Sequence, residues 1–177
     1  MVFTETKLKG AFIIEPERRE DERGFFARTF CQREFEAHGL NPRVVQCSVS
    51  YNKKEGTLRG IHYQIPPHAE TKLVRCIQGA IYDVIVDLRR ESLTFKQWIA
   101  VELSAVNRKM LYVPDGVGHG FQTLEDSSEV FYQMSEFYDP ECARGVRWND
   151  PVFAIQWPVA EGIIISDRDS HYPDYQC

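Results

Sequence analysis

Apolar and polar residues alternate along most of this chain, and that alternation is the pattern of β-strands with one buried face. Residues 32–39 are the one convincing helical piece, because this glutamate-rich segment ends at Gly39 with Pro42 just beyond. Strands are predicted over residues 7–15, 24–30, 44–51, 58–64, 71–77, 80–88, 98–105, 109–114, 120–125 and 129–138. A strand about every 8 to 12 residues is typical of an all-β sandwich or barrel.

Residues 71–88 carry the clearest hairpin signal, because two strand-like runs meet at a Gln-Gly pair that ends in Gly79. In the second run, alternate side chains point to opposite sides, with Val84 on one side and Ile85 on the other. We therefore expect the two runs to pair with each other, and one face of the second run to be core.

The densest group of chemically active residues lies in residues 57–72, with the sequence TLRGIHYQIPPHAETK. Regular alternation along its strand would put Arg59 on one face and His62 on the other. The proline pair ends this strand, and the next strand opens at about residue 70. We therefore expect Lys72 to return alongside His62 on the sheet surface, so that a base and a cation face one pocket.

Length and charge limit the classes to which this chain can belong. A chain of 177 residues fits one domain, taken as residues 1–177. Its core can be large enough to fold without disulfides or a structural metal. The net charge of −5 argues against a nucleic-acid binder, which normally carries a basic excess. No apolar run is long enough to span a membrane or to act as a signal peptide, so a soluble, cytoplasmic protein with no membrane partner is expected.

The cysteine pattern agrees with a cytoplasmic location. The cysteines are odd in number, widely spaced and never in a C-x-x-C pair, at Cys31, Cys47, Cys76, Cys142 and Cys177. This pattern predicts free thiols in a reducing compartment.

A metal site is one alternative for the histidines, since His62, His68, Glu70 and His119 are all possible ligands. A pair of ligands on one strand would need His-x-His spacing so that both rings leave the same face. The two positions after His62 hold a tyrosine and a glutamine, and His68 follows two prolines where it is expected to face solvent. The spacing therefore favours a site without a metal.

Three further residues could act in a site, although each also has an ordinary structural interpretation. His119 lies between two glycines. This pattern fits a strand whose backbone passes close to a ligand, or a loop with two glycines in which the histidine is incidental. Tyr132 belongs to an aromatic stripe that could be core, but a phenol is also a usable proton donor. Asp169 lies in a charged tetrapeptide, and it would orient the His62 ring if it folded back onto it.

Six segments carry motifs in a consistent order and spacing: DERGFF at 21–26, TLRGIHYQ at 57–64, TKLVRCIQGAIYDVIVDLR at 71–89, VPDGVGHGF at 113–121, RWNDP at 147–151 and SDRD at 166–169. Together they resemble the dTDP-4-dehydrorhamnose 3,5-epimerase family over nearly the whole chain. The resemblance implies a cupin-type antiparallel β-barrel or jelly roll with a few short helices. It also implies a homodimer that exchanges strands, no metal and no cofactor.

The resemblance further implies an isomerase that inverts C3, C5 or both in a nucleotide-diphosphate 4-keto-6-deoxyhexose. By this likeness His62 is the base, Asp169 its partner, Lys72 the group that stabilises the enolate, and Tyr132 the acid on the opposite face of the sugar. Tyr138 would stack on the nucleotide base. The residues implied in holding the nucleotide sugar are Arg23, Gln46, Arg59, His119 and Arg168.

The sequence departs from the family pattern in three places, all expected in the shell that holds the ligand. Arg28 and Ala143 each stand where a glutamate is usual, and the segment that begins at Gln46 carries one extra residue before Gly56. Two rival functions stay open at this point. One is a metal-dependent cupin oxygenase or isomerase that uses the ligands named above, and the other is a sugar-binding cupin without catalysis.

Overall fold

The computed structural model describes residues 1–176, and most of their regular structure is antiparallel β-sheet. One sheet has the spatial order β1 (Val2–Glu5), β2 (Phe12–Glu15), β10 (Met110–Val113), β7 (Lys72–Gln78), β12 (Ser128–Met134) and β5 (Gln46–Asn52). The other has the order β13 (Ala143–Gly145), β6 (Leu58–Gln64), β11 (Val117–Thr123), β8 (Ala80–Asp87) and β9 (Trp98–Ser104). A separate hairpin pairs β3 (Arg18–Asp21) with β4 (Gly24–Ala27), and the short helices are α1 (Gln32–Ala37) and α2 (Asp167–Ser170).

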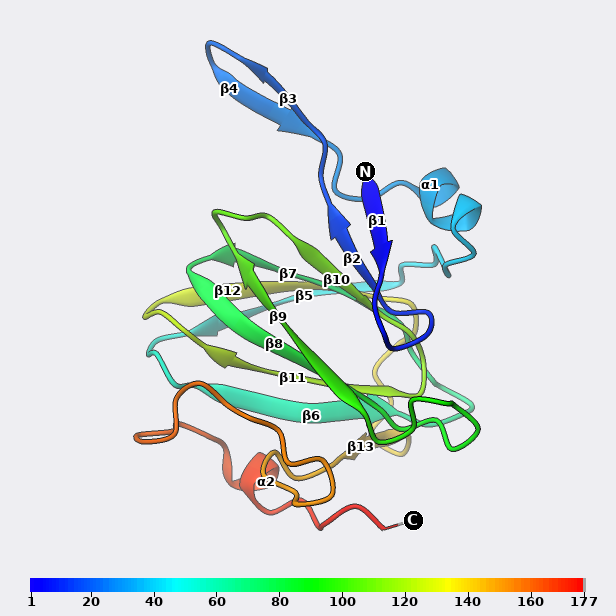
Figure 1. Cartoon of the computed structure of the whole chain (residues 1–177), viewed down its shortest axis with the longest axis vertical. Helices are drawn as coiled ribbons and strands as arrows, with labels where there is room; N and C mark the ends of the chain where they lie inside the picture. The colour runs from blue at the N-terminus through cyan, green and yellow to red at the C-terminus, as the bar shows by residue number, and fades with distance from the viewer. Residues whose placement is uncertain (177) are drawn as a thin grey trace.

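The two large sheets face each other as the walls of a jelly roll (Figure 1). Both walls contribute to one interior cluster, in which Val74, Leu111 and Val130 from the six-stranded sheet meet Ile85 and Phe121 from the five-stranded sheet. The prediction of an all-β, cupin-type antiparallel barrel with a few short helices is confirmed. Within residues 1–176, no helix is long and apolar enough to cross a membrane.

The predicted hairpin at residues 71–88 is wrong. Strand β7 hydrogen-bonds to β10 and β12 in one sheet, whereas β8 hydrogen-bonds to β9 and β11 in the other. Gly79 carries the chain between the sheets at a φ of 71°, and a Cβ added there would lie 2.5 Å from Ser128 Oγ. The Gln-Gly pair signals a turn, but the choice of sheet depends on partners far away in the sequence. Strands β7 and β8 therefore belong to opposite walls.

Strand β8 is buried on both faces, not on one as expected. Ile85 points into the interior cluster, while Val84 and Val86 pack with Val146 and Phe153 in a second cluster. These last two residues belong to the carboxyl-terminal segment, which runs past the five-stranded sheet after β13 (Figure 1). This covering layer buries the outer face of the sheet and also brings α2 against β6.

Strand β6 contains a bulge that corrects the predicted faces. His62 pairs with His119 and Arg59 with Phe121, so one extra residue separates the pairs on β6. Gly60 lies in this bulge at a φ of 119°, where a Cβ would lie 2.5 Å from a backbone Cα of β11. Because paired residues share a face, the bulge turns Arg59 to the same side of the sheet as His62, contrary to strict alternation.

The amino-terminal strand prediction also needs correction. Only Phe12–Glu15 of the predicted strand at 7–15 is extended, and the unpredicted β1 precedes it. Between the two strands, the Ala11 N–H donates to the carbonyl of Leu8 and closes a turn. Strands β3 and β13 were also not predicted. The predicted strands from residue 44 onward lie within a few residues of their expected bounds, β4 covers only the first part of 24–30, and α1 matches the predicted helix.

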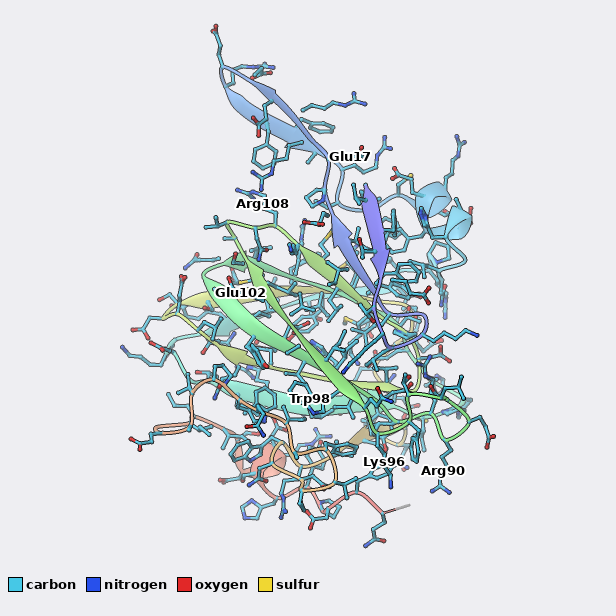
Figure 2. The ribbon with its side chains drawn as sticks, viewed as in Figure 1. Glu17, Arg90, Lys96, Trp98, Glu102 and Arg108 are labelled. Carbon is cyan, nitrogen blue, oxygen red and sulfur yellow. The ribbon has the colours of Figure 1, made fainter. Side chains whose placement is uncertain are left out.

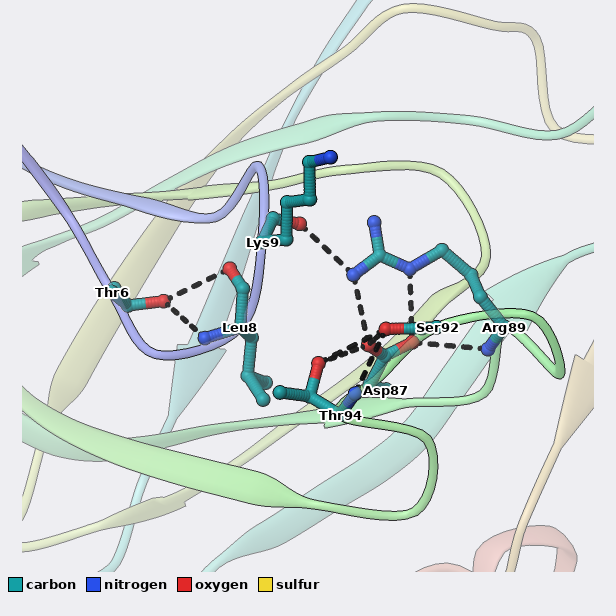
Figure 3. Close-up of polar contacts among 7 residues, drawn as sticks. All are labelled: Thr6, Leu8, Lys9, Asp87, Arg89, Ser92 and Thr94. Atoms are coloured by element: carbon teal, nitrogen blue, oxygen red, sulfur yellow. Dashed lines mark hydrogen bonds and ion pairs between the residues drawn. The ribbon is translucent and has the colours of Figure 1, made fainter.

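A buried carboxylate ties the amino-terminal turn to the end of β8 (Figure 3). Arg89 donates to both oxygens of Asp87 and to the carbonyl of Lys9. Ser92 and Thr94 also donate to Asp87. Although burial alone would raise the pKa of Asp87, these hydrogen bonds lower it to about 2.

The β3–β4 hairpin projects away from the two main sheets (Figure 1). The guanidinium carbons of Arg18 and Arg108 lie 5.1 and 4.7 Å from the ring centre of Phe25, which pairs with Glu20 near the turn of the hairpin. Figure 2 shows Arg108 between the hairpin and the barrel. Phe26, the residue after Phe25, is 74% exposed.

Candidate active site

An open pocket of about 260 Å³ lies between the two sheets. Its lining comes from both walls and from the carboxyl-terminal segment, and includes Gln46, Ser48, His62, Tyr63, Gln64, Glu70, Lys72, Tyr132, Met134, Tyr138, Ala143, Arg144 and Arg168. Six of the ten residues predicted for a site are in this lining: His62, Lys72, Tyr132, Gln46, Tyr138 and Arg168. The pocket thus gathers residues from β5, β6, β7 and β12.

His62 forms a pair with Asp169 at one side of the pocket. Its Nε2 lies 2.8 Å from Asp169 Oδ1, and the Gly60 N–H donates to the other carboxylate oxygen at 3.2 Å. Helix α2 positions the aspartate, because Ser166 caps its amino-terminal end by accepting from the Asp169 N–H. Burial alone would raise the pKa of Asp169, but the hydrogen bond with His62 and the nearby charges lower it. The carboxylate is therefore ionised and orients the imidazole.

Lys72 lies across the pocket from His62, not beside it as expected. His62 is on β6 in the five-stranded sheet, and Lys72 opens β7 in the six-stranded sheet. The Lys72 ammonium is 2.6 Å from Glu70 Oε1, and both side chains are 11% exposed. The two walls thus present a base and a paired ammonium group to one space.

Tyr132 and a second histidine–aspartate pair lie deeper in the same region. His119 Nε2 is 2.7 Å from Asp83 Oδ1, and these side chains are 5% and 0% exposed. The rings of His119 and Tyr132 meet edge to face with centroids 6.0 Å apart. Burial raises the pKa of Tyr132 far above its ordinary value, and Asp83 adds to the effect while Arg59 opposes it. The phenol therefore stays protonated at any physiological pH.

The remaining predicted residues differ in how close they come to the pocket. Gln46 accepts the Tyr138 N–H through its side-chain oxygen at 2.6 Å, which holds these two residues together. Arg59 donates to Asn52 of β5, in the opposite sheet, at 2.8 Å. Arg23 does not join them, because it lies on the projecting hairpin with its side chain 89% exposed and paired with Asp21.

Residues that alter the family pattern lie near the pocket or the hairpin. Ala143 is in the pocket wall, where its small side chain leaves space that a glutamate would fill. Arg28 pairs with Glu34 of α1 at 2.9 Å. The Arg28 substitution is therefore balanced by a local carboxylate.

Sequence reasoning missed two carboxylates of the site. The sequence suggests Glu70 only as a metal ligand, although residues two apart on an extended chain share a face, so its position two residues before Lys72 is a usable signal. Asp83 interrupts an apolar strand, and a carboxylate in such a run must be paired if it is buried. The histidine that pairs with Asp83 could not be read from local sequence.

The candidate metal ligands do not assemble into one site. Among residues 1–176 no three His, Cys, Asp or Glu side chains are close enough to hold a metal ion. Each candidate histidine instead meets its own aspartate, His62 with Asp169, His68 with Asp139 and His119 with Asp83. Cys31, Cys47, Cys76 and Cys142 are free thiols as predicted, and Cys177 lies outside the described residues.

Comparison with known proteins identifies the family. The family model described as dTDP-4-dehydrorhamnose 3,5-epimerase matches residues 5–176. The enzyme of that name from Shigella flexneri is 44% identical over 93% of this chain and 90% of its own length. The crystal structure from Elizabethkingia anophelis NUHP1 has a TM-score of 0.96 at 40% identity, covering 99% of this chain and 96% of the other.

A further relative was solved with ligands. The Bacillus anthracis dTDP-4-dehydrorhamnose 3,5-epimerase, with TDP and PPi bound, has a TM-score of 0.94 at 45% identity and covers 98% of this chain and 99% of the other. The likeness therefore extends through the sequence and the fold over nearly the whole chain. This chain belongs to the dTDP-4-dehydrorhamnose 3,5-epimerase family of isomerases.

Proposed function

We propose that this enzyme inverts C3 and C5 of a dTDP-4-keto-6-deoxyhexose by removing and returning a proton through an enolate. The observation that carries the proposal is that His62 and Lys72 face one pocket from opposite walls. A ketone at C4 makes the hydrogens on C3 and C5 acidic only if charge on its oxygen is stabilised. A base and a cation on two sides of the sugar meet both requirements.

His62 is the base in this proposal. Its Nε2 is engaged by Asp169, so Nδ1 is the ring nitrogen left to take the proton. Asp169 stabilises the imidazolium that forms, and then His62 releases the proton to solvent. Imidazole suits this task because its ordinary pKa of about 6.5 lies near neutral pH.

Lys72 stabilises the enolate oxygen at C4. One well-placed donor to an oxyanion is worth about 3–4 kcal/mol of barrier. Glu70 accepts one N–H of the ammonium group, and that leaves the others free for the ketone oxygen. The Lys72–Glu70 pair is close to neutral overall. Glu70 therefore brings no unpaired negative charge near the enolate oxygen.

Tyr132 is the acid that returns a proton to the opposite face of the sugar. It lines the pocket from β12 in the wall that faces His62, so a sugar between them would have one group on each side. Its raised pKa keeps the hydroxyl protonated, so a proton is present on this side of the sugar when the enolate forms. Inversion follows because the proton leaves on one face and arrives on the other.

The nucleotide is proposed to lie at the mouth of the pocket. A volume of about 260 Å³ is smaller than the roughly 300–1,000 Å³ of pockets that enclose a drug-sized ligand, so the sugar would fill it. Tyr138, which is 58% exposed, is suited to stack on the base. Gln46, Arg59, His119 and Arg168 would hold the rest of the nucleotide sugar. The ligand bound to the Bacillus anthracis relative supports thymidine as the nucleoside.

A homodimer with exchanged hairpins is proposed to complete this site. Arg23 lies on a projecting hairpin, so it can reach a nucleotide only in the pocket of another copy. Strand β5 ends its sheet beside the pocket, and its exposed outward residues Val49 and Tyr51 offer apolar surface to a partner.

A cytoplasmic location is supported by the free thiols.

The decisive experiment follows deuterium from heavy water into the sugar at C3 and C5 by NMR. The wild-type enzyme is expected to exchange both positions, whereas His62→Ala and Lys72→Ala are expected to exchange neither. Lys53→Ala, which removes an exposed lysine, is the matched control and should behave like wild type. Normal uptake in the His62→Ala or Lys72→Ala variant overturns the assignment, and binding without any exchange in the wild type would support a sugar-binding protein instead.

A further inference from the structure

The ring of Tyr172 lies beside His62, in space that the glycine on the neighbouring strand leaves open. His62 pairs across the ladder with Gly145 of β13. A Cβ added at Gly145 would overlap the Tyr172 ring, so the ring lies directly against the backbone at this position. Glycine at 145 therefore makes room for a ring next to the proposed base.

The Tyr172 ring also contacts two groups of the site. It meets the His62 ring edge to face, with centroids 6.0 Å apart and planes at 69°. The guanidinium carbon of Arg168 lies 5.8 Å from the centre of the Tyr172 ring. Aromatic edge-to-face contacts and cation–ring contacts at these distances are attractive and directional. One ring thus adjoins both the proposed base and a cation of the pocket wall.

The position of Tyr172 in the chain adds to this effect. It lies two residues after the end of α2, the short helix that carries Arg168 and Asp169. A ring fixed against β13 therefore anchors the segment that delivers both residues to β6. Four residues of helix have little stability of their own, so their position depends on such contacts.

We propose that Tyr172 is a positioning residue for the epimerase reaction, holding the His62 ring against Asp169 and the Arg168 guanidinium at the pocket wall through its aromatic ring. This inference rests on the proposed function of His62. The ring makes the contacts with His62 and Gly145, so phenylalanine should serve nearly as well as tyrosine.

The first test compares Tyr172→Ala with Tyr172→Phe. Tyr172→Ala is expected to lower kcat by about tenfold, which corresponds to about 1.4 kcal/mol of barrier, because the imidazole is no longer held in place. It should also raise KM severalfold through Arg168. Tyr172→Phe should stay within about twofold of wild type in both parameters. An equal loss in Tyr172→Phe, or wild-type kcat in Tyr172→Ala, overturns the proposal.

The second test approaches the same contact from the other strand. Gly145→Ala places a methyl group where the ring lies, so it should displace Tyr172 and reproduce the loss of kcat. In the double variant the ring is absent, and Gly145→Ala should cost little beyond Tyr172→Ala alone. Losses that simply add in the double variant would show that the two residues do not act through one contact.

A third measurement separates this inference from the proposed function. The Nε2 proton of His62, bonded to Asp169, should give a proton NMR signal protected from solvent exchange in wild type and Tyr172→Phe. It should exchange rapidly in Tyr172→Ala at a temperature where the chain stays folded. A protected signal in Tyr172→Ala refutes positioning, whether or not the enzyme turns over the proposed substrate.

Discussion

Asp169→Asn tests whether a carboxylate, and not merely a polar side chain, is required beside His62. Two N–H groups converge on this carboxylate, since His62 Nε2 lies 2.8 Å from Oδ1 and the Gly60 N–H lies 3.2 Å from Oδ2. An amide offers one oxygen and one NH₂ group, so asparagine can accept only one of these hydrogen bonds. The substitution keeps the size of the side chain and changes only its chemistry.

Each orientation of the amide has a cost. With its oxygen toward His62, the amide leaves the Gly60 N–H without an acceptor, at about 1–3 kcal/mol of stability. The hydrogen bond to His62 also loses its charged acceptor, worth about 1–1.5 kcal/mol, or about tenfold in rate. With the oxygen toward Gly60, the NH₂ group donates to Nε2, and the imidazole proton moves to Nδ1. That tautomer has no free lone pair for the substrate, so activity would fall further.

The assay combines exchange kinetics with unfolding. Deuterium uptake at C3 and C5 should slow at least tenfold, and urea unfolding should show a loss of about 1–3 kcal/mol. The pKa of Asp169 is lower in the folded chain than its ordinary value, so the carboxylate stabilises the fold at neutral pH. This stabilisation is lost as the pH falls through the folded-state pKa, and the gap between wild type and Asp169→Asn should close there. Exchange at the wild-type rate in Asp169→Asn would refute the reasoning.

Three other predictions follow from the site and the fold. Tyr132→Phe should still let the substrate proton exchange with solvent but should lose inversion, and an unchanged epimeric product by NMR would remove Tyr132 from the mechanism. Gly60→Ala should lower the free energy of unfolding by at least about 2 kcal/mol, because the Cβ would meet β11. Gly24→Ala, at a similar φ of 126° with open space around it, is the control and should lose less in urea unfolding. Asp87→Asn should lose about 2 kcal/mol at pH 7, since the pKa of Asp87 is lowered to about 2, and a deficit that persists unchanged when the pH drops from 4 to 2 would contradict this.

Much of the fold could be read from local pattern. A strand with one buried face shows alternating apolar and polar residues over four to eight positions. The positions of β5, β6, β9 and β12 are therefore close to those expected. The cluster of residues 57–72 pointed to the pocket because charged groups are rarely gathered on a strand without a partner. The short helix at 32–39 was also recognisable from its glutamates and its terminal glycine.

Sheet membership and strand faces were decided only by the tertiary structure. The turn at Gly79 reads as a hairpin, yet β7 and β8 enter different sheets because their partners lie elsewhere in the chain. The bulge at Gly60 depends on the register with β11, and it moves Arg59 to the side of His62. Both features follow from contacts between residues distant in sequence, which alternation does not encode.

The sequence by itself determined an all-β chain, the segments that become strands, and the residue types able to remove a proton beside a ketone. Only the tertiary structure decided that Lys72 faces His62 across the pocket, that Glu70 holds its ammonium group, and that Asp83 pairs with His119. The physical reason is that alternation is set by neighbours two residues apart, whereas a site forms where distant strands meet.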